Sequence, residues 1–363
     1  MSKRDTLWRE RFGFAIAVAL AMAAATIVVA AAYNLPIRDP DDAGGPTYIR
    51  LPAILLLAFL TDVVPRAIHR ARKSGSLRAF GVQFGAVTRE RWPPDHIRFA
   101  LLGLGSWYLT YAAFRNLKSF VPVVNRGLHD NALARIDRWM FFGHDPAVLL
   151  HDLLGTDVAA HMLSFVYIAW IVLVPASLAA ALVWSRSVSG GSWLVTGVGV
   201  DWALGAITYF LVPTVGPVFI HPDVFAGLSH TSVTTIQQSM ADDRAAVLAD
   251  PSATNAVQTI AAFASLHVGI TVTICLIAYW LGLNRWFQRA LWVFLALTVV
   301  ATIYLGWHYA TDCIGGAVLG FLGAWLAAIG TGNHVRGWPT HVRTSDAAVE
   351  TTGAADGAAV REA

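Results

Sequence analysis

Long apolar stretches alternate with short polar connections along most of the 363-residue chain. A run of about 20 apolar residues is long enough to cross a bilayer as a helix. Eight runs approach this length, at 12–33, 48–64, 99–121, 158–184, 193–213, 260–281, 290–307 and 309–329. Asp62 and Pro65 shorten the second run, and the first is too long for a removable signal peptide. The pattern predicts an all-α, polytopic membrane bundle of about eight transmembrane helices.

The composition agrees with this pattern, because 56% of the residues are hydrophobic and only 13% are charged. Soluble domains carry roughly 25% charged residues, so the composition excludes a soluble globular protein. The two cysteines, Cys275 and Cys313, both lie in apolar runs and indicate neither a disulfide framework nor a cysteine metal site. The Ala- and Arg-rich, Lys-poor usage is typical of a GC-rich bacterial genome.

Basic residues collect in the connections that fall on one side of an eight-span bundle. Those of the N-terminus and the second connection are Lys3, Arg4, Arg9, Arg11, Arg66, Arg70, Arg72, Lys73, Arg78, Arg89, Arg91 and Arg98. The connection at 214–259 carries a single basic residue, Arg244. Since basic loops stay in the cytoplasm, we expect both termini on the cytoplasmic side of a bacterial plasma membrane. The turn at His308 then faces outward.

The connection after the third run is too long for a tight turn. Its segments 133–142 and 146–154 mix large apolar residues with charges at near-helical spacing, which is typical of amphipathic helices in the membrane interface. They would form either a platform that admits a lipid sideways or a plain cap over the bundle. The predicted domains are an N-terminal two-helix membrane segment with a cytoplasmic loop (1–98), a six-helix catalytic membrane core (99–330) and a disordered cytoplasmic tail (331–363).

Candidate chemistry gathers where the seventh run meets the eighth. His308 and Asp312 are four residues apart, so a helix would place both on one face. A carboxylate there can hold the imidazole in one tautomer and stabilise its charged form. A second histidine, His267, lies at the outward start of the sixth run, at the same depth and on the same side. A plain ion pair at the helix start would also explain His308 with Asp312.

Two histidines and an aspartate suit phosphoryl transfer. One imidazole attacks phosphorus to give a phosphohistidine, and the other protonates the leaving oxygen. Basic side chains neutralise the charge that builds on the phosphate oxygens. Two histidines and an aspartate are also a zinc ligand set, but phosphoryl transfer additionally accounts for Ser265 and the basic residues nearby.

These residues carry a family resemblance. Ser265-Leu-His267 with Tyr304-x-x-x-His308-Tyr-x-x-Asp312 resembles the second and third signature motifs of the type 2 phosphatidic acid phosphatase superfamily. The resemblance runs from about Tyr111 to about Gly330 and is closest to the inositol phosphorylceramide synthase-like branch. It implies a six-helix core in which His308 is the nucleophile, Asp312 its orienting partner and His267 the acid and base, with no metal or other cofactor.

The chain also departs from the superfamily motifs. Thr302 stands where the third motif usually has an arginine. The synthase-like branch also lacks this arginine. The first motif is a lysine followed by Arg-Pro, whereas here Lys118 is followed by Asn125 at that spacing and Arg126 one residue later. The candidates for binding phosphate or substrate are Arg115, Lys118, Arg126, Ser265 and Tyr304. The three basic residues would alternatively be interfacial anchors.

Two classes of function follow. The first is a membrane enzyme that takes a phosphoryl group or phospho-headgroup, such as phosphoinositol, from a lipid phosphate or phospholipid donor to an alcohol, a lipid acceptor or water. The second is a transporter or channel in which His308, His267 and the mid-span Asp201 form a proton or ion path. The two histidines gather at one depth and Asp201 is alone at another, which favours the enzyme. We expect membrane lipids, and no nucleic acid, as partners.

Overall fold

The computed structural model describes residues 3–39, 47–74, 77–185 and 187–341. This part of the chain is almost entirely helical, which confirms the predicted all-α class. The long helices are α1 (Lys3–Tyr33), α2 (Thr47–Lys73), α4 (Pro94–Val124), α7 (Val158–Ala179), α8 (Val188–Leu211), α11 (Ser232–Ala249), α12 (Leu266–Trp280), α13 (Arg285–Tyr304) and α14 (Ala310–Gly330). The short ones are η2 (Leu77–Ala79), α3 (Phe80–Arg91), α5 (Asp130–Met140), α6 (Pro146–Leu154), η3 (Ala180–Trp184), α9 (Pro217–Ile220) and α10 (Pro222–Phe225).

Five helical segments are long and apolar enough to cross a membrane. They are Arg11–Tyr33, Val158–Trp184, Val188–Leu211, Arg285–Tyr304 and Ala310–Gly330. Helix α12 is apolar but has only 15 residues, because residues 260–265 of the predicted sixth run are not helical. Helices α2 and α4 are long enough but carry more polar residues. The helical membrane architecture is therefore confirmed, and the count of eight spans stays a prediction.

Helix α8 lies at the centre of the bundle and packs against α1, α4, α12 and α14. Its sequence is rich in Gly, Ser, Thr and Val, and small side chains let neighbouring membrane helices approach closely. The most buried helices thus converge around α8, and the site described below is built at one end of this core.

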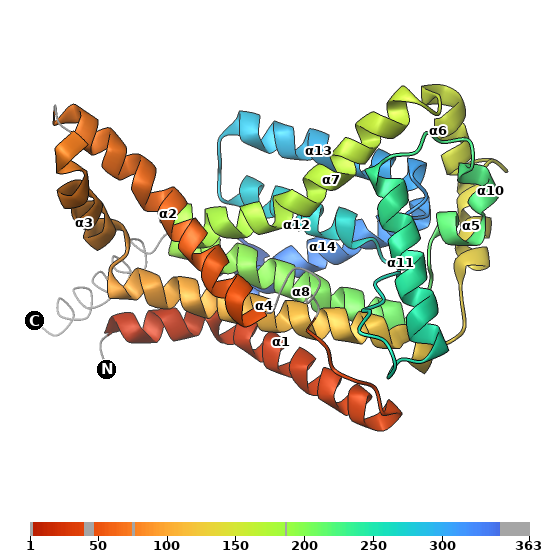
Figure 1. Ribbon diagram of the computed structural model, residues 1–363, viewed down its shortest axis with the longest axis horizontal. Helices are drawn as coiled ribbons and strands as arrows, with labels where there is room; N and C mark the ends of the chain where they lie inside the picture. Colours follow the sequence, from red (N-terminus) through yellow and green to blue (C-terminus); the bar gives the residue numbers. More distant parts are fainter. Residues whose placement is uncertain (1–2, 40–46, 75–76, 186, 342–363) are drawn as a thin grey trace, which may run out of the picture.

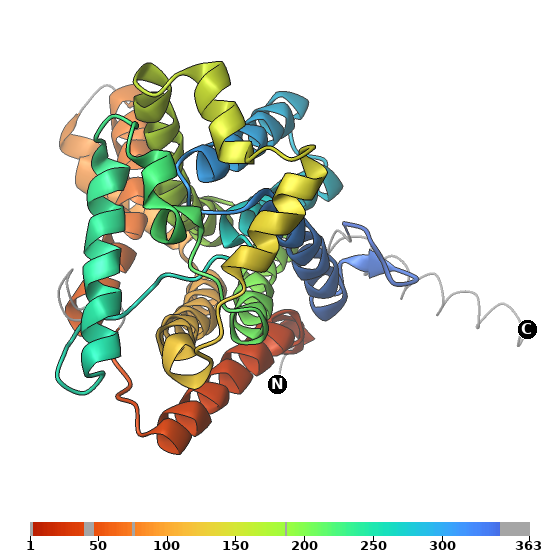
Figure 2. The ribbon, with the colours of Figure 1, turned by 90° about the vertical axis from the view of Figure 1, so that its right-hand side faces the viewer.

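The bundle has two distinct ends (Figure 1). Helix α3, the start of α1 and the end of α14 lie at one end, and α5, α6, α10 and α11 gather at the other. Viewed from that second end, α5 lies across the bundle beside the start of α14, and α11 stands along one side (Figure 2). The two predicted amphipathic segments are thus the helices α5 and α6, and both belong to this end.

A short hairpin follows α14. Strands β1 (His334–Val335) and β2 (Trp338–Pro339) pair antiparallel, and the indole N–H of Trp325 in α14 donates to the Gly337 carbonyl at 2.9 Å. The predicted disordered tail began at residue 331, so its first part is instead held against α14 by this contact. Residues 342–363 of that tail lie outside the described residues.

Candidate active site

The end of α13 places His308. The N–H groups of Gly306 and Trp307 donate to the carbonyls of Ile303 and Thr302, at 3.1 and 2.9 Å, which is a Schellman ending. Gly306 has a φ of +74°, a conformation that costs glycine little. The chain therefore turns sharply after α13. His308 follows directly, and its N–H also donates to the Thr302 carbonyl, at 3.2 Å.

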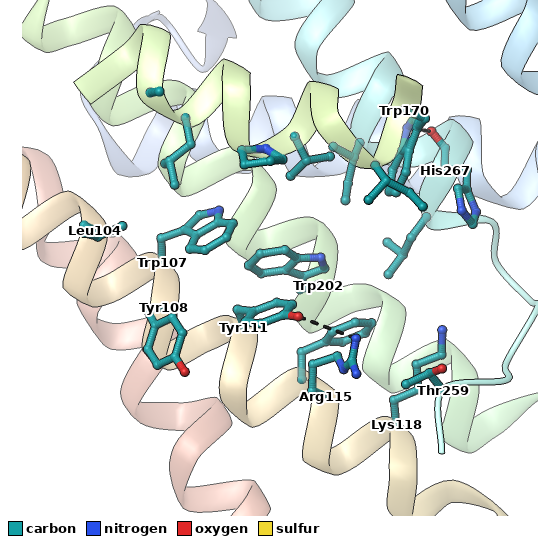
Figure 3. A pocket seen from close by; sticks show the side chains of 18 of the residues that line it. Leu104, Trp107, Tyr108, Tyr111, Arg115, Lys118, Trp170, Trp202, Thr259 and His267 are labelled. Carbon is teal, nitrogen blue, oxygen red and sulfur yellow. Dashed lines mark hydrogen bonds between the residues drawn. The ribbon is translucent and has the colours of Figure 1, made fainter. Parts of the chain in front are cut away.

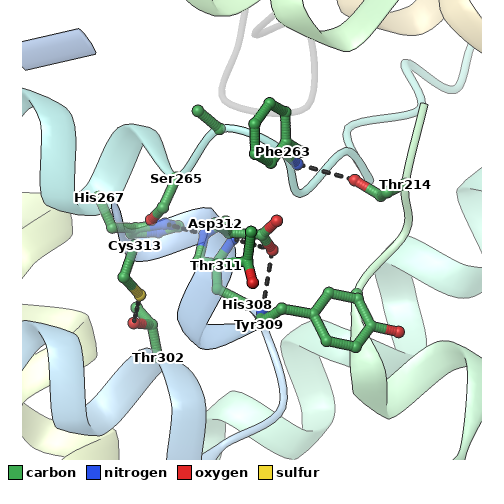
Figure 4. A network of polar contacts seen from close by, with 12 residues as sticks. Thr214, Phe263, Ser265, His267, Thr302, His308, Tyr309, Thr311, Asp312 and Cys313 are labelled. Atoms are coloured by element: carbon green, nitrogen blue, oxygen red, sulfur yellow. Dashed lines mark hydrogen bonds and ion pairs between the residues drawn. The ribbon is translucent and has the colours of Figure 1, made fainter. Parts of the chain in front are cut away.

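The start of α14 places Asp312 against this turn (Figure 4). One carboxylate oxygen, Oδ2, accepts the N–H of Tyr309 at 2.9 Å and lies 3.4 Å from Nδ1 of His308. The other oxygen, Oδ1, is buried with no hydrogen-bond partner among the described residues. The contact to His308 is longer than the roughly 2.8 Å of a charge-assisted hydrogen bond, so it has room to shorten when the imidazole becomes positive.

Two aspartates of α5 clamp the same region. Asp137 accepts the N–H groups of Ala310 and Thr311 at 2.7 and 2.9 Å, and the Thr311 hydroxyl at 2.5 Å. These are the first N–H groups of α14, which have no partner inside the helix. Asp130 accepts the N–H of Gly216 at 2.9 Å in the loop after α8. Helix α5 thereby joins the His308–Asp312 turn to the neighbouring loop.

The start of α12 brings in the second histidine. The Ser265 hydroxyl accepts the N–H of Val268 at 3.4 Å as the N-cap, and the Ser265 N–H donates to the Asp312 carbonyl at 3.0 Å. A side chain at Gly316 of α14 would overlap the Ser265 carbonyl. Glycine at that position therefore lets the two helix starts meet, which places His267 beside the α13–α14 turn.

The two imidazoles face each other, with Nδ1 of His267 2.9 Å from Nε2 of His308. A hydrogen bond between them needs one proton and one lone pair. If Nδ1 of His308 holds its proton for Asp312, then Nε2 carries the lone pair and His267 is the donor. The His267 ring is held against Trp170, with ring centroids 4.3 Å apart. The geometry thus leaves Nε2 of His308 turned toward His267.

His308 is neutral over the physiological pH range. Burial and, next, the nearby Lys118 ammonium lower the pKa of His308 to about 3, against an opposing hydrogen bond with the Ala262 carbonyl. A neutral imidazole keeps its lone pair, as a nucleophile requires.

Both histidines line one end of a cavity of about 540 Å³. Arg115 and Lys118 of α4 line the same end (Figure 3). Arg115 lies 3.5 Å from the Tyr111 hydroxyl, and the Lys118 ammonium lies 4.9 Å from the ring centroid of Tyr209. Two basic side chains and the two imidazoles thus line the same end of one cavity.

The other predicted binding residues do not line this cavity. Ser265 is fully buried as the cap of α12. Tyr304 is fully buried as well, and its hydroxyl donates to the Gly155 carbonyl at 2.7 Å. Arg126 lines a separate cavity of about 270 Å³ together with Arg244. Arg115 and Lys118 therefore line the cavity with the two histidines, and Ser265, Tyr304 and Arg126 do not.

Sequence reasoning missed the two clamping aspartates. Asp130 and Asp137 are seven residues apart, which is two helical turns and places both on one face of α5. Both are buried, while Trp139 on another face is 81% exposed. The available signal was that α5 carries two carboxylates on one stripe of a strongly amphipathic helix, but nothing in the sequence alone gives their partners.

Asp201 is fully buried in α8 and does not line the cavity that contains the two histidines.

Among the described residues, no group of three or more His, Cys, Asp or Glu side chains is arranged to hold a metal ion.

The fold and the site together define an integral membrane helical bundle with paired histidines at the end of an apolar cavity. A family model for the PAP2 superfamily matches residues 131–326, which is more than half of the chain. The chain belongs to the PAP2 superfamily, and this membership supports a phosphatase-type enzyme that acts on lipid phosphates. No curated protein and no solved structure matched the chain.

Proposed function

We propose that the protein transfers a phosphoryl group or phospho-headgroup from a membrane lipid through a phosphohistidine on His308. The observation that carries this proposal is the approach of His308 Nε2 to His267 Nδ1, at 2.9 Å, at the cationic end of the cavity. An in-line displacement at phosphorus needs a nucleophile, a proton donor and cations in such an arrangement.

In the first half of the reaction, the Nε2 lone pair of His308 forms a bond to phosphorus and the bond from phosphorus to the leaving oxygen breaks. The substrate phosphate must first separate the two rings, because Nε2 is already engaged by His267. The anionic phosphate between the rings stabilises a charged His267, which gives its Nδ1 proton to the leaving oxygen. Asp312 stabilises the positive His308 that results.

In the second half, an alcohol or water attacks the phosphohistidine. Its proton passes to His267, the nitrogen–phosphorus bond breaks, and the electron pair returns to Nε2 of His308. We assign Arg115 and Lys118 to the phosphate oxygens, because both line the same end of the cavity as the histidines. They would replace the arginine that the third motif lacks at Thr302, whose side chain is fully buried beneath the turn.

We place the chain in the inositol phosphorylceramide synthase-like branch, on its Ser-Leu-His motif and on Thr302, and propose an alcohol as the usual acceptor. We further propose that eight helices cross the membrane, with a six-helix catalytic core at 99–330 after two N-terminal helices. The end of the bundle that carries α5 and α11 would face outward. A proton path through Asp201 is less well supported, since Asp201 does not line the histidine cavity.

The experiment is turnover of lipid phosphate and phospholipid donors by the purified protein in excess chelator, with and without an added alcohol. We expect activity to persist in chelator. Asp312→Asn should lower kcat on the order of 10⁴-fold, as in a comparable His–Asp pair. Activity that disappears with chelator and returns with zinc would contradict the phosphohistidine mechanism. Mostly free phosphate would indicate a phosphatase, whereas mostly the phosphate ester of the added alcohol would indicate a transferase.

A further inference from the structure

The cavity that begins at the two histidines continues far along the bundle. On α4 its lining runs from Lys118 to Ala100, and on α7 and η3 from Tyr167 to Val183. Lys118 lies 18 positions after Ala100, which is about 27 Å along the helix because each residue adds a rise of 1.5 Å. The hydrocarbon core of a bilayer is about 30 Å thick. The cavity therefore runs along most of the depth of the hydrocarbon core, and well beyond a single leaflet.

The walls change character along this length. Beside Arg115, the rings of Tyr111, Trp107 and Trp202 form one wall, with Tyr111 and Trp107 stacked at 5.6 Å and Tyr111 and Trp202 5.2 Å apart (Figure 3). Beyond Leu104 the wall is formed by aliphatic side chains and one tryptophan. One end thus attracts an anion, and the remainder accepts only apolar groups.

A group of hydrogen-bonded and ion-paired side chains lies at the far end. Trp92 lines the cavity there, and its indole N–H donates to Asp62 of α2 at 3.2 Å. Asp62 is fully buried and also accepts from Arg91 at 2.6 Å and Arg66 at 2.5 Å. Ala58, one turn before Asp62, lines the cavity beside Trp92. This ion-pair group, centred on the buried Asp62, ties α2 to Trp92 at the far end of the cavity, which we call the floor.

We propose that the cavity holds one hydrocarbon chain of the donor lipid, from the phosphate at His308 to the floor at Trp92. Donors whose chain is longer than one leaflet are then accommodated inside the protein, and the floor limits the chain length. This proposal rests on the proposed function for the identity of the headgroup. It is supported by the continuity of the apolar passage with the cationic end, where Arg115 and Lys118 would hold the phosphate.

The test is cross-linking with single-chain lipid phosphates that carry a photoreactive diazirine at the far end of the chain. The protein is placed in vesicles of ordinary phospholipid, and the labelled peptides are identified by mass spectrometry. A chain as long as the cavity should label the floor, at Leu55, Ala58 and Trp92. A chain of half that length should label the aromatic wall around Trp107 and Trp202. Excess unlabelled lipid phosphate should displace both labels.

Ala58→Trp blocks the floor from α2, and Ala53→Trp makes the same change at an exposed position of the same helix. We expect Ala58→Trp to lower floor labelling by the long chain at least about tenfold, since two excluded methylenes are worth about that much, and to leave the half-length label unchanged. Ala53→Trp should change neither.

Labels spread over lipid-facing surfaces, or labels that excess lipid phosphate does not displace, would overturn the proposal. Cross-linking needs no turnover, so the two proposals fail separately. Competed labels at the floor without phosphoryl transfer would refute the proposed function and leave the cavity assignment standing. Turnover with labels only on outer surfaces would do the reverse.

Discussion

Nδ1 of His267 and Nε2 of His308 lie 2.9 Å apart, so the nitrogen that we propose as the nucleophile and the proposed proton donor are in contact. Each has a different partner on its other side. His308 has the Asp312 carboxylate, whereas the ring of His267 lies against Trp170. The two histidines are therefore not equivalent, and their substitutions should differ in kind.

His267→Ala should slow the reaction without preventing the first bond to phosphorus. The leaving oxygen then departs unaided, and the incoming alcohol or water lacks its base. With a lipid donor, kcat should fall about 10²- to 10⁴-fold, the usual contribution of general acid–base catalysis. With an aryl phosphate, whose leaving group needs little help, capture by His308 should persist. A rapid-quench measurement of aryl alcohol release checks this, and equal loss with both donors would contradict the assignment.

The lowered pKa of His308 also predicts how the stability of the protein depends on pH. Its pKa is about 3 in the folded protein, against about 6.5 when unfolded. Between these values the unfolded chain binds the proton and the folded protein does not. Stability is therefore lost as the pH falls from about 6.5 toward 3. At pH about 4.5 the unfolding free energy lost through His308 is about 2 to 3 kcal/mol.

Unfolding midpoints at pH about 7 and about 4.5 check this contribution, with His308→Gln as the comparison. The substituted protein should lose less stability on acidification than the parent does. Equal losses in both proteins would show that His308 is not held neutral by burial.

At the level of single residues, the sequence predicted the three groups that now lie together. The depth of His267 follows from the span boundaries. The expected helix through His308 and Asp312 is wrong, since His308 lies in the turn before α14 and the turn at Gly306 brings the two together. The partners of Asp137 could not be predicted from the sequence, since Ala310 is 173 positions away in the chain. Ser265 and Tyr304 were motif residues, but the motif does not show that packing uses them as a cap and a tether.

Helix α5 is the element that fixes the start of α14. Asp137→Ala would leave the N–H groups of Ala310 and Thr311 without their partner in a buried place. We expect a loss of about 1 to 3 kcal/mol in unfolding free energy. Because His308 lies two residues before Ala310, kcat should fall as well, on the order of tenfold or more.

A matched control is available in Asp145, which caps α6 by accepting the N–H of Ala147 at 2.8 Å. Asp145→Ala should lower stability by a similar amount and leave kcat nearly unchanged, because α6 does not carry the histidines. Unfolding midpoints and turnover, measured on both proteins, decide the matter. Equal effects on kcat would mean that Asp137 contributes only general stability.

Helix α4 shows why some spans were harder to identify from sequence. Its inner face carries Trp107, Tyr111, Arg115 and Lys118, all of which line the cavity. These side chains lower the mean hydropathy of a helix that is otherwise long enough to span. The sixth run differs for another reason, since its first residues at 260–265 are not helical, two of them (Ile260 and Ala261) line the cavity, and α12 begins only at Leu266.

At the scale of the whole molecule, the two ends of the bundle differ. The site lies near the end that carries α5 and α11. The distribution of Lys and Arg predicts that this end faces outward. Ala245→Cys on α11 should react with an impermeant thiol reagent from outside intact cells. Val82→Cys on α3, at a position that is 73% exposed, should react only after the cells are opened.

The two native cysteines provide the background for this labelling, since Cys275 and Cys313 are both buried. The reverse pattern of labelling would place the site on the cytoplasmic side. In that case the chemistry proposed for the histidines would stand, but its donor lipid would come from the other leaflet.

The central claim is that His308 carries the phosphoryl group. The most direct measurement is incubation of the purified protein with a phosphorus-labelled donor, followed by a rapid quench and a count of the label on the protein. The account predicts label that is acid-labile and base-stable, that is lost in His308→Ala, and that accumulates in His267→Ala when the donor is an aryl phosphate. Label that survives His308→Ala would show that another residue is the nucleophile, and the assignment of the site would be wrong.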